Sequence, residues 1–122
     1  VHCIAEALGG QYDLPHGVCN AVTLPAVMEY NLDYCVDRYA RIAVAMGLGD
    51  GSVESRARQA VAEVKKLAAD IHLPEFRQLG VKEDDFEKLA NNSAANGSNR
   101  DNPRPMEKGD YLKILMGLNE TA

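Results

Sequence analysis

The longest run of helical periodicity places the strongest constraint on how this chain can fold. Between Ser52 and Ile71, apolar residues recur every three or four positions, so they fall on one side of an α-helix. They are Ala57, Ala60, Val61, Val64, Leu67, Ala68 and Ile71. Ser52 is a favourable N-cap, and Leu73-Pro74 cannot continue a helix. Because no stretch alternates apolar and polar residues, as a half-buried strand would, the sequence predicts an all-α fold.

Shorter helices are expected on both sides of this segment, about seven in all, within one domain over residues 1–122. Their expected ranges are the start to Gly9, His16 to about Tyr30, about Tyr34 to Met46, Ser52 to Ile71, Glu75 to Leu79, Glu83 to about Ala90, and Lys108 to Leu118. Gly9-Gly10 should end the first helix, and Pro25 should bend or shorten the second. The third helix should end at a group of glycines, namely Gly47, Gly49 and Gly51. The polar segment 91–105 predicts a loop.

Charge and cysteine content narrow the class of protein. The formal net charge of -5 does not favour nucleic acid or an anionic membrane as a partner. No apolar run approaches the roughly 20 residues that span a bilayer. The number of cysteines is odd and no Cys-x-x-Cys occurs, which predicts buried, unpaired thiols at Cys3, Cys19 and Cys35 and a reducing, cytoplasmic location.

Two histidines near the start of the chain are candidate metal ligands. His2 and Glu6 are one helical turn apart and flank an apolar stripe, so both side chains can face a cleft while the helix stays packed. The turn that ends at Pro15 can return His16 to the side of His2. His16 would then begin the next helix, where the positive end of the helix dipole favours a neutral imidazole able to bind a cation.

The residues alone also allow a purely structural role for these histidines, since most histidines in helical surroundings are surface or core residues. His72 is expected to be structural, because it lies beside Leu73-Pro74 at a helix end, where a cation suits the C-terminal dipole.

The first 31 residues, VHCIAEALGGQYDLPHGVCNAVTLPAVMEYN, resemble the signature of the iron-containing, or group III, alcohol dehydrogenases. The matching positions are His2, Leu8, Gly9, Pro15, His16, Gly17, Val18, Asn20 and Ala21. Further segments resemble the family in the same order, namely RYARIAVAMG, LAADIHLPEFRQLGVKEDDFEKLA and DNPRP. The resemblance therefore extends over essentially the whole chain.

This resemblance implies the helical, metal-binding C-terminal domain of an enzyme that interconverts short primary alcohols and aldehydes. Family members hold Fe²⁺, or sometimes Zn²⁺, with one aspartate and three histidines, and two of these histidines match His2 and His16. The aspartate, the third histidine and the domain that binds NAD(P) are expected upstream of Val1. The metal acts as a Lewis acid on the alcohol or carbonyl oxygen, and hydride passes to the nicotinamide. A homo-oligomer is a further expectation.

The sequence departs from the family pattern at four positions. Glu6 stands where the family usually has a histidine near the nicotinamide and substrate, so Glu6 is a candidate catalytic residue or an added carboxylate ligand. Ala26 replaces a histidine, and Ser98 and Asp101 stand where cysteine and threonine are usual.

Two other functions remain as alternatives. The chain can be a non-catalytic helical module whose histidines are only structural. It can also be a self-contained metallohydrolase that uses His2, Glu6 and His16, because such a donor set is chemically competent for zinc.

Overall fold

The computed structural model describes residues 1–48 and 50–120, and in these residues all regular structure is helical, as the sequence predicts. The α-helices are α1 (His2–Tyr12), α2 (His16–Asn31), α3 (Val36–Ala45), α4 (Val53–Asp70), α5 (Phe86–Ala95) and α6 (Lys108–Glu120). Short 3₁₀ helices connect them, namely η1 (Leu32–Tyr34), η2 (Phe76–Leu79), η3 (Glu83–Asp85) and η4 (Gly97–Asp101).

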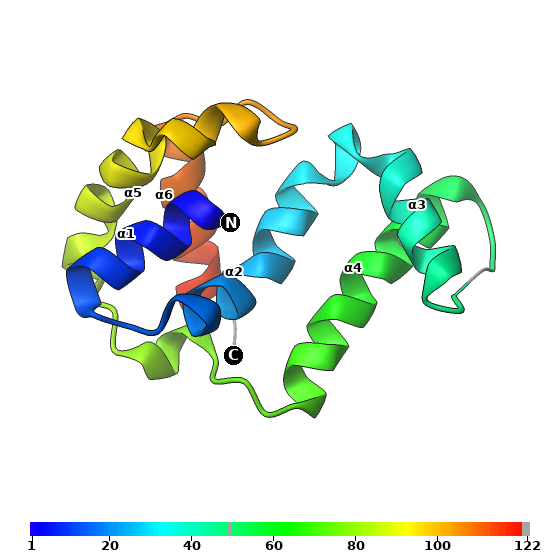
Figure 1. Cartoon of the computed structure of the whole chain (residues 1–122), viewed down its shortest axis with the longest axis horizontal. Helices are drawn as coiled ribbons and strands as arrows, with labels where there is room; N and C mark the ends of the chain where they lie inside the picture. Colours follow the sequence, from blue (N-terminus) through cyan, green and yellow to red (C-terminus); the bar gives the residue numbers. More distant parts are fainter. Residues whose placement is uncertain (49, 121–122) are drawn as a thin grey trace.

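The helices pack around two apolar cores, and α2 reaches both (Figure 1). The larger core joins α1, α2, α5 and α6, with Ile4, Leu89 and Leu115 among its fully buried residues. The smaller core lies between α3, α4 and η1, and includes Tyr39 and Ala57. The helix α2 therefore holds the α3–α4 hairpin beside the larger core.

The first helix does not end at Gly9-Gly10, so that expectation is wrong. α1 continues to Tyr12, and Asp13 then adopts a left-handed conformation with φ 54°. The two glycines weaken a helix by roughly 1 kcal/mol each. Tertiary contacts offset this cost, because the Tyr12 hydroxyl donates a hydrogen bond to Asp85 and accepts one from the Lys82 amide.

The second helix has the expected extent, since α2 begins at His16 and ends at Asn31, and Pro25 does not end it early. The end of the helix is held by a reciprocal pair of amide hydrogen bonds between Asn31 and Asn102, at 2.9 and 2.8 Å. Arg104 adds a hydrogen bond of 2.9 Å to the Tyr30 carbonyl. The family segment around Asn102 thus has a structural role, which is to fasten η4 to the end of α2.

The predicted loop over 91–105 is partly helical. α5 continues to Ala95 and η4 follows at once, and the buried Ser93 hydroxyl donates a hydrogen bond to the Leu89 carbonyl one turn earlier. Burial of this serine on the α1 side stabilises a turn whose composition alone predicts a loop.

The central helix confirms part of its predicted pattern. Ser52 caps α4 by accepting a hydrogen bond from the Ser55 amide at 3.1 Å. Of the predicted apolar stripe, only Ala57 and Ala60 are fully buried, whereas Leu67 and Ile71 are 51% and 59% exposed. The helix thus packs through its first half.

The breaks around the α3–α4 hairpin are also largely as expected. The third helix is shorter than predicted, because residues 32–34 form the separate 3₁₀ helix η1. Gly47 and Gly51 have positive φ angles that favour glycine, and Gly49 lies outside the described residues.

All three cysteines are buried and free, as predicted. Among the described residues, no helix has the length and apolar content to cross a membrane.

His72 has a specific structural position at the end of α4. Its amide donates to the Ala69 carbonyl at 3.1 Å, and the next amide, of Leu73, donates to the Ala68 carbonyl at 3.0 Å. This pair of bonds is a Schellman C-cap, and His72 occupies its left-handed position with φ 60°. Glycine is the residue that adopts this conformation without steric cost.

We expect His72→Gly to raise the free energy of unfolding by about 0.5–1 kcal/mol, because it removes the steric cost of a left-handed side chain. Urea denaturation measures the change. Gly80→Ala is the matched control and should lower the free energy of unfolding. Gly80 has φ 76°, which is costly for alanine, and no atom lies near an added Cβ that would add a clash. A lower stability for His72→Gly would contradict the assignment of strain at this cap.

We expect Asn102→Ala to lower the free energy of unfolding by about 2 kcal/mol, because the nearly buried amide of Asn31 loses both of its partners. The same denaturation assay measures this loss. Replacement of the exposed Asn92 by alanine is the control, with an expected change within about 0.5 kcal/mol. Equal effects in the two variants would show that the Asn31–Asn102 pair does not hold α2.

Candidate metal centre

The two histidines singled out by the sequence lie side by side. His2 is the first residue of α1 and His16 is the first residue of α2, and the connection through Pro15 brings these two helix starts together. The centres of the two imidazole rings are 5.0 Å apart, and the ring planes cross at 79°. The predicted convergence of His2 and His16 is therefore present in the structure.

The packing of α1 and α2 explains why both rings are exposed. Ile4, Ala5 and Leu8 are fully buried against the larger core, which leaves His2 and Glu6 on the open side of α1. On α2, the fully buried side chains of Cys19 and Thr23 face the core, and His16 remains exposed. Burial of the apolar residues thus directs the two imidazoles outward into the same region.

The distance between the rings fits two imidazoles that share one metal ion. An ion bonded to one nitrogen of each ring at roughly 2.1 Å lies roughly 3.3 Å from each ring centre, so a tetrahedral angle separates the centres by roughly 5.3 Å. The observed separation is 5.0 Å. His2 and His16 are therefore close enough to hold a divalent metal together.

The described residues do not complete such a site. Within residues 1–48 and 50–120, no group of three histidine, cysteine, aspartate or glutamate side chains is arranged to hold a metal ion. The self-contained His2, Glu6 and His16 centre of a metallohydrolase is accordingly not formed. Among the described residues, the two imidazoles are a pair of possible nitrogen donors without a third ligand.

Glu6 lies between the histidine pair and the end of α5. One carboxylate oxygen, Oε1, is 2.9 Å from His2 Nε2, and the other accepts a hydrogen bond from the side-chain amide of Asn96. The amide of Asn96, and to a smaller extent the imidazole of His2, lower the pKa of Glu6 because they favour its charged form. Glu6 is therefore an anionic acceptor beside one of the two imidazoles.

Two further departures from the family pattern also lie next to His2. Ser98 and Asp101, both in η4, line a small cavity of about 290 Å³ together with His2 and Tyr111. The structure thus gathers Glu6, Ser98 and Asp101 around one histidine, although they are far apart in the sequence.

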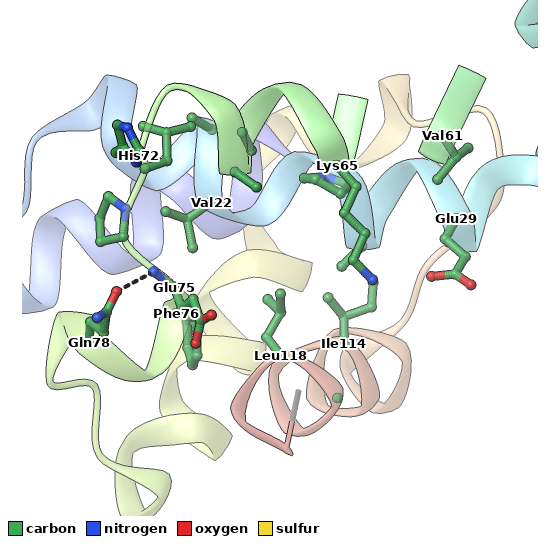
Figure 2. A pocket seen from close by; sticks show the side chains of 18 residues that line it. Val22, Glu29, Val61, Lys65, His72, Glu75, Phe76, Gln78, Ile114 and Leu118 are labelled. Carbon is green, nitrogen blue, oxygen red and sulfur yellow. Dashed lines mark hydrogen bonds between the residues drawn. The ribbon is translucent and has the colours of Figure 1, made fainter. Parts of the chain in front are cut away.

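Ala26 and His72 belong to a different part of the molecule. They line a cleft of about 720 Å³ between α2, α4, η2 and α6, and neither His2 nor His16 lines it. Figure 2 shows Val22, Phe76 and Leu118 around this space, with the hydrogen bond from the Glu75 amide to the Gln78 side chain at its edge. Most of the lining residues are apolar. The structure therefore separates His72 from the histidine pair, in agreement with the structural role expected for it.

Sequence reasoning missed Asn96. It lies within the predicted loop, and its contact with Glu6 joins residues 90 positions apart. No local pattern indicates such a contact, because it depends on how α5 packs against α1.

Comparisons with known proteins identify the family and the fold of the chain. Residues 1–118 match the model of the Fe-containing alcohol dehydrogenase family, C-terminal. The chain is 46% identical over 118 residues to a 1,3-propanediol dehydrogenase of Citrobacter freundii. The aligned residues make up 94% of this chain and 30% of that protein. It is 33% identical over 118 residues to an NAD-dependent methanol dehydrogenase of Bacillus methanolicus. This alignment covers 94% of this chain and 31% of that protein.

A solved structure shares the fold. The alcohol dehydrogenase from Oenococcus oeni superposes with a TM-score of 0.90 at 38% identity, covering 96% of this chain and 31% of that one. The chain thus spans about a third of the length of the proteins it matches. Together, the family match, the sequence identities and the shared fold show that this chain belongs to the iron-containing alcohol dehydrogenase family and corresponds to its C-terminal region.

Proposed function

We propose that this chain supplies two metal ligands, His2 and His16, to an enzyme that interconverts short primary alcohols and aldehydes with NAD(P). The observation that carries the proposal is the 5.0 Å separation of the two imidazole rings at the start of α1 and α2. The relatives that are named for propanediol and methanol support a small alcohol as the substrate.

Each residue has a defined part in this proposal. His2 and His16 would hold the ion through one ring nitrogen each, since a metal binds the unprotonated nitrogen of an imidazole. Bound Fe²⁺ or Zn²⁺ supplies Lewis-acid polarisation of the alcohol or carbonyl oxygen. The buried face of α1 keeps His2 beside His16, and Glu6 lies one turn further along the open side of α1. In our proposal Glu6 would act near the nicotinamide and the substrate.

The remaining parts of the centre come from outside this chain in our proposal. The aspartate, the third histidine and the NAD(P)-binding residues belong to the part of the relatives that this chain does not match. The NAD-dependent relative supports NAD as the cofactor. We also propose a cytoplasmic homo-oligomer, and the three buried free thiols are compatible with a reducing compartment.

In the whole enzyme that contains this chain, we expect His2→Ala and His16→Ala each to weaken metal binding by orders of magnitude and to abolish turnover, because each removes one ligand. Elemental analysis of the purified variants measures the bound metal. His72→Ala is the control, because His72 lies in the other cleft and at a helix cap. That variant should keep its metal and lose at most about 1 kcal/mol of stability.

Full metal occupancy in both His2→Ala and His16→Ala would contradict the proposal. It would favour the alternative of a non-catalytic helical module with structural histidines.

We expect the 122-residue chain alone to have no dehydrogenase activity, because the described residues contain only part of a metal site. The measurement is NADH formation from propanediol or ethanol with added Fe²⁺ or Zn²⁺. The control is the same mixture without protein, and turnover above it would show that the chain contains a complete centre.

A further inference from the structure

The small cavity beside His2 contains two polar side chains that the fold leaves without a partner. The cavity has a volume of about 290 Å³, and its walls come from the start of α1, from η4 and the residues directly after it, and from α6. Ser98 and Asp101 line it from η4. In the part of the chain that the structure describes, neither the Ser98 hydroxyl nor the Asp101 carboxylate has a hydrogen bond or an ion pair.

The other polar side chains of the η4 and α6 walls are already engaged in the fold. The Asn102 amide forms its reciprocal pair with Asn31, and the Tyr111 hydroxyl donates a hydrogen bond to the Asn99 side chain. These two side chains therefore serve the packing of η4 against α2 and α6. The hydroxyl of Ser98 and the carboxylate of Asp101 are the groups on these walls that remain for a ligand.

The chemistry of these two groups favours one kind of ligand. A carboxylate only accepts hydrogen bonds, whereas a hydroxyl both donates and accepts them. No lysine or arginine is among the described residues that line the cavity, so the charge of Asp101 has no cation beside it there. The cavity thus suits a group that donates a hydrogen bond, such as a hydroxyl, and disfavours a second carboxylate.

The cavity also lies close to where an alcohol would react in the proposed enzyme. There, His2 holds the ion through a ring nitrogen, and the alcohol oxygen binds the same ion, so this oxygen lies within roughly 4 Å of that nitrogen. The side chain of His2 lines the cavity as well. The carbon chain of a short alcohol that begins beside His2 can therefore extend toward η4.

We propose that Ser98 and Asp101 are specificity-determining residues that bind the second hydroxyl of a short diol, such as 1,3-propanediol, while its first hydroxyl reacts. This inference rests on the proposed function, because it narrows the substrate of that same site from a small alcohol to a diol. It also assigns a use to two positions at which the chain departs from the family pattern.

The kcat/KM of the whole enzyme for the diol, divided by its kcat/KM for n-propanol, measures this selection. The two alcohols share one carbon chain and differ only in the second hydroxyl. We expect Asp101→Ala to lower the ratio about tenfold, because it removes a charged acceptor, and Ser98→Ala to lower it by a smaller factor. A loss of stability or of bound metal changes both values alike, so a merely structural role would not move the ratio.

Two further variants test the charge and supply a control. Asp101→Asn keeps the shape of the side chain and one acceptor oxygen but removes the charge. It should raise the kcat/KM for the hydroxy acid 3-hydroxypropanoate several-fold relative to n-propanol, because it removes a like-charge repulsion. Asp84→Ala is the matched control, because Asp84 is also an exposed aspartate in a 3₁₀ helix and does not line this cavity. Both ratios should stay within about twofold in this variant.

Binding to the 122-residue chain gives a second measurement, which needs neither metal nor NAD(P). ¹H–¹⁵N correlation spectra show which backbone amides shift when an alcohol is added. We expect the diol to shift the amides of Ser98 and Asp101 with a dissociation constant in the millimolar range, as suits so small a ligand. n-Propanol should shift them less at the same concentration, and Asp101→Ala should remove this difference.

The outcomes separate this inference from the proposed function. Equal ratios of kcat/KM in the wild type and in Asp101→Ala, or equal amide shifts with the diol and n-propanol, would overturn the roles of Ser98 and Asp101 only. A metal-loaded whole enzyme that oxidises neither alcohol would instead contradict the proposed function.

Discussion

Burial of one face of α1 is the constraint on which the rest of the site depends. Ile4, Ala5 and Leu8 have no exposed surface, and they pack into the core that α2, α5 and α6 complete. Because successive residues of a helix turn by a fixed angle, burial of this face determines where His2 and Glu6 point. The same burial stabilises the helix through Gly9-Gly10, so His2 and Glu6 belong to a helix that the core holds in place.

The histidine pair has a second support in the segment that connects α5 to α6 and contains η4. This segment contacts the start of α1 through Asn96 and Glu6, and it contacts the end of α2 through Asn102 and Asn31. It therefore holds both helices that carry the histidines. Side-chain amides can connect two helices in this way, because each has a hydrogen-bond donor and an acceptor and can bind two partners at once. The histidine pair is thus supported from the core below and from η4 beside it.

Much of the fold was predictable from the chain itself, and the errors share a cause. The all-α class, the Ser52 cap, the helix after Leu73-Pro74 and the convergence of His2 with His16 were expected and are present. The errors were helix ends, at Gly9-Gly10 and within 91–105, and both segments are stabilised by contacts distant in sequence. Local propensity differs by about 1 kcal/mol at such positions, which one buried contact or hydrogen bond can outweigh.

The sequence by itself determined which helices form and which histidines carry the family motif, because helical periodicity, capping and the motif are local properties of the chain. Only the tertiary structure decided what surrounds His2. Glu6 and Asn96 are 90 positions apart, and Ser98 and Asp101 reach His2 only because α5 packs on α1. Spacing along a chain carries no information about such contacts. They depend on the packing of side chains between helices, and this packing brought Ser98 and Asp101 beside His2 and placed Ala26 in a different cleft.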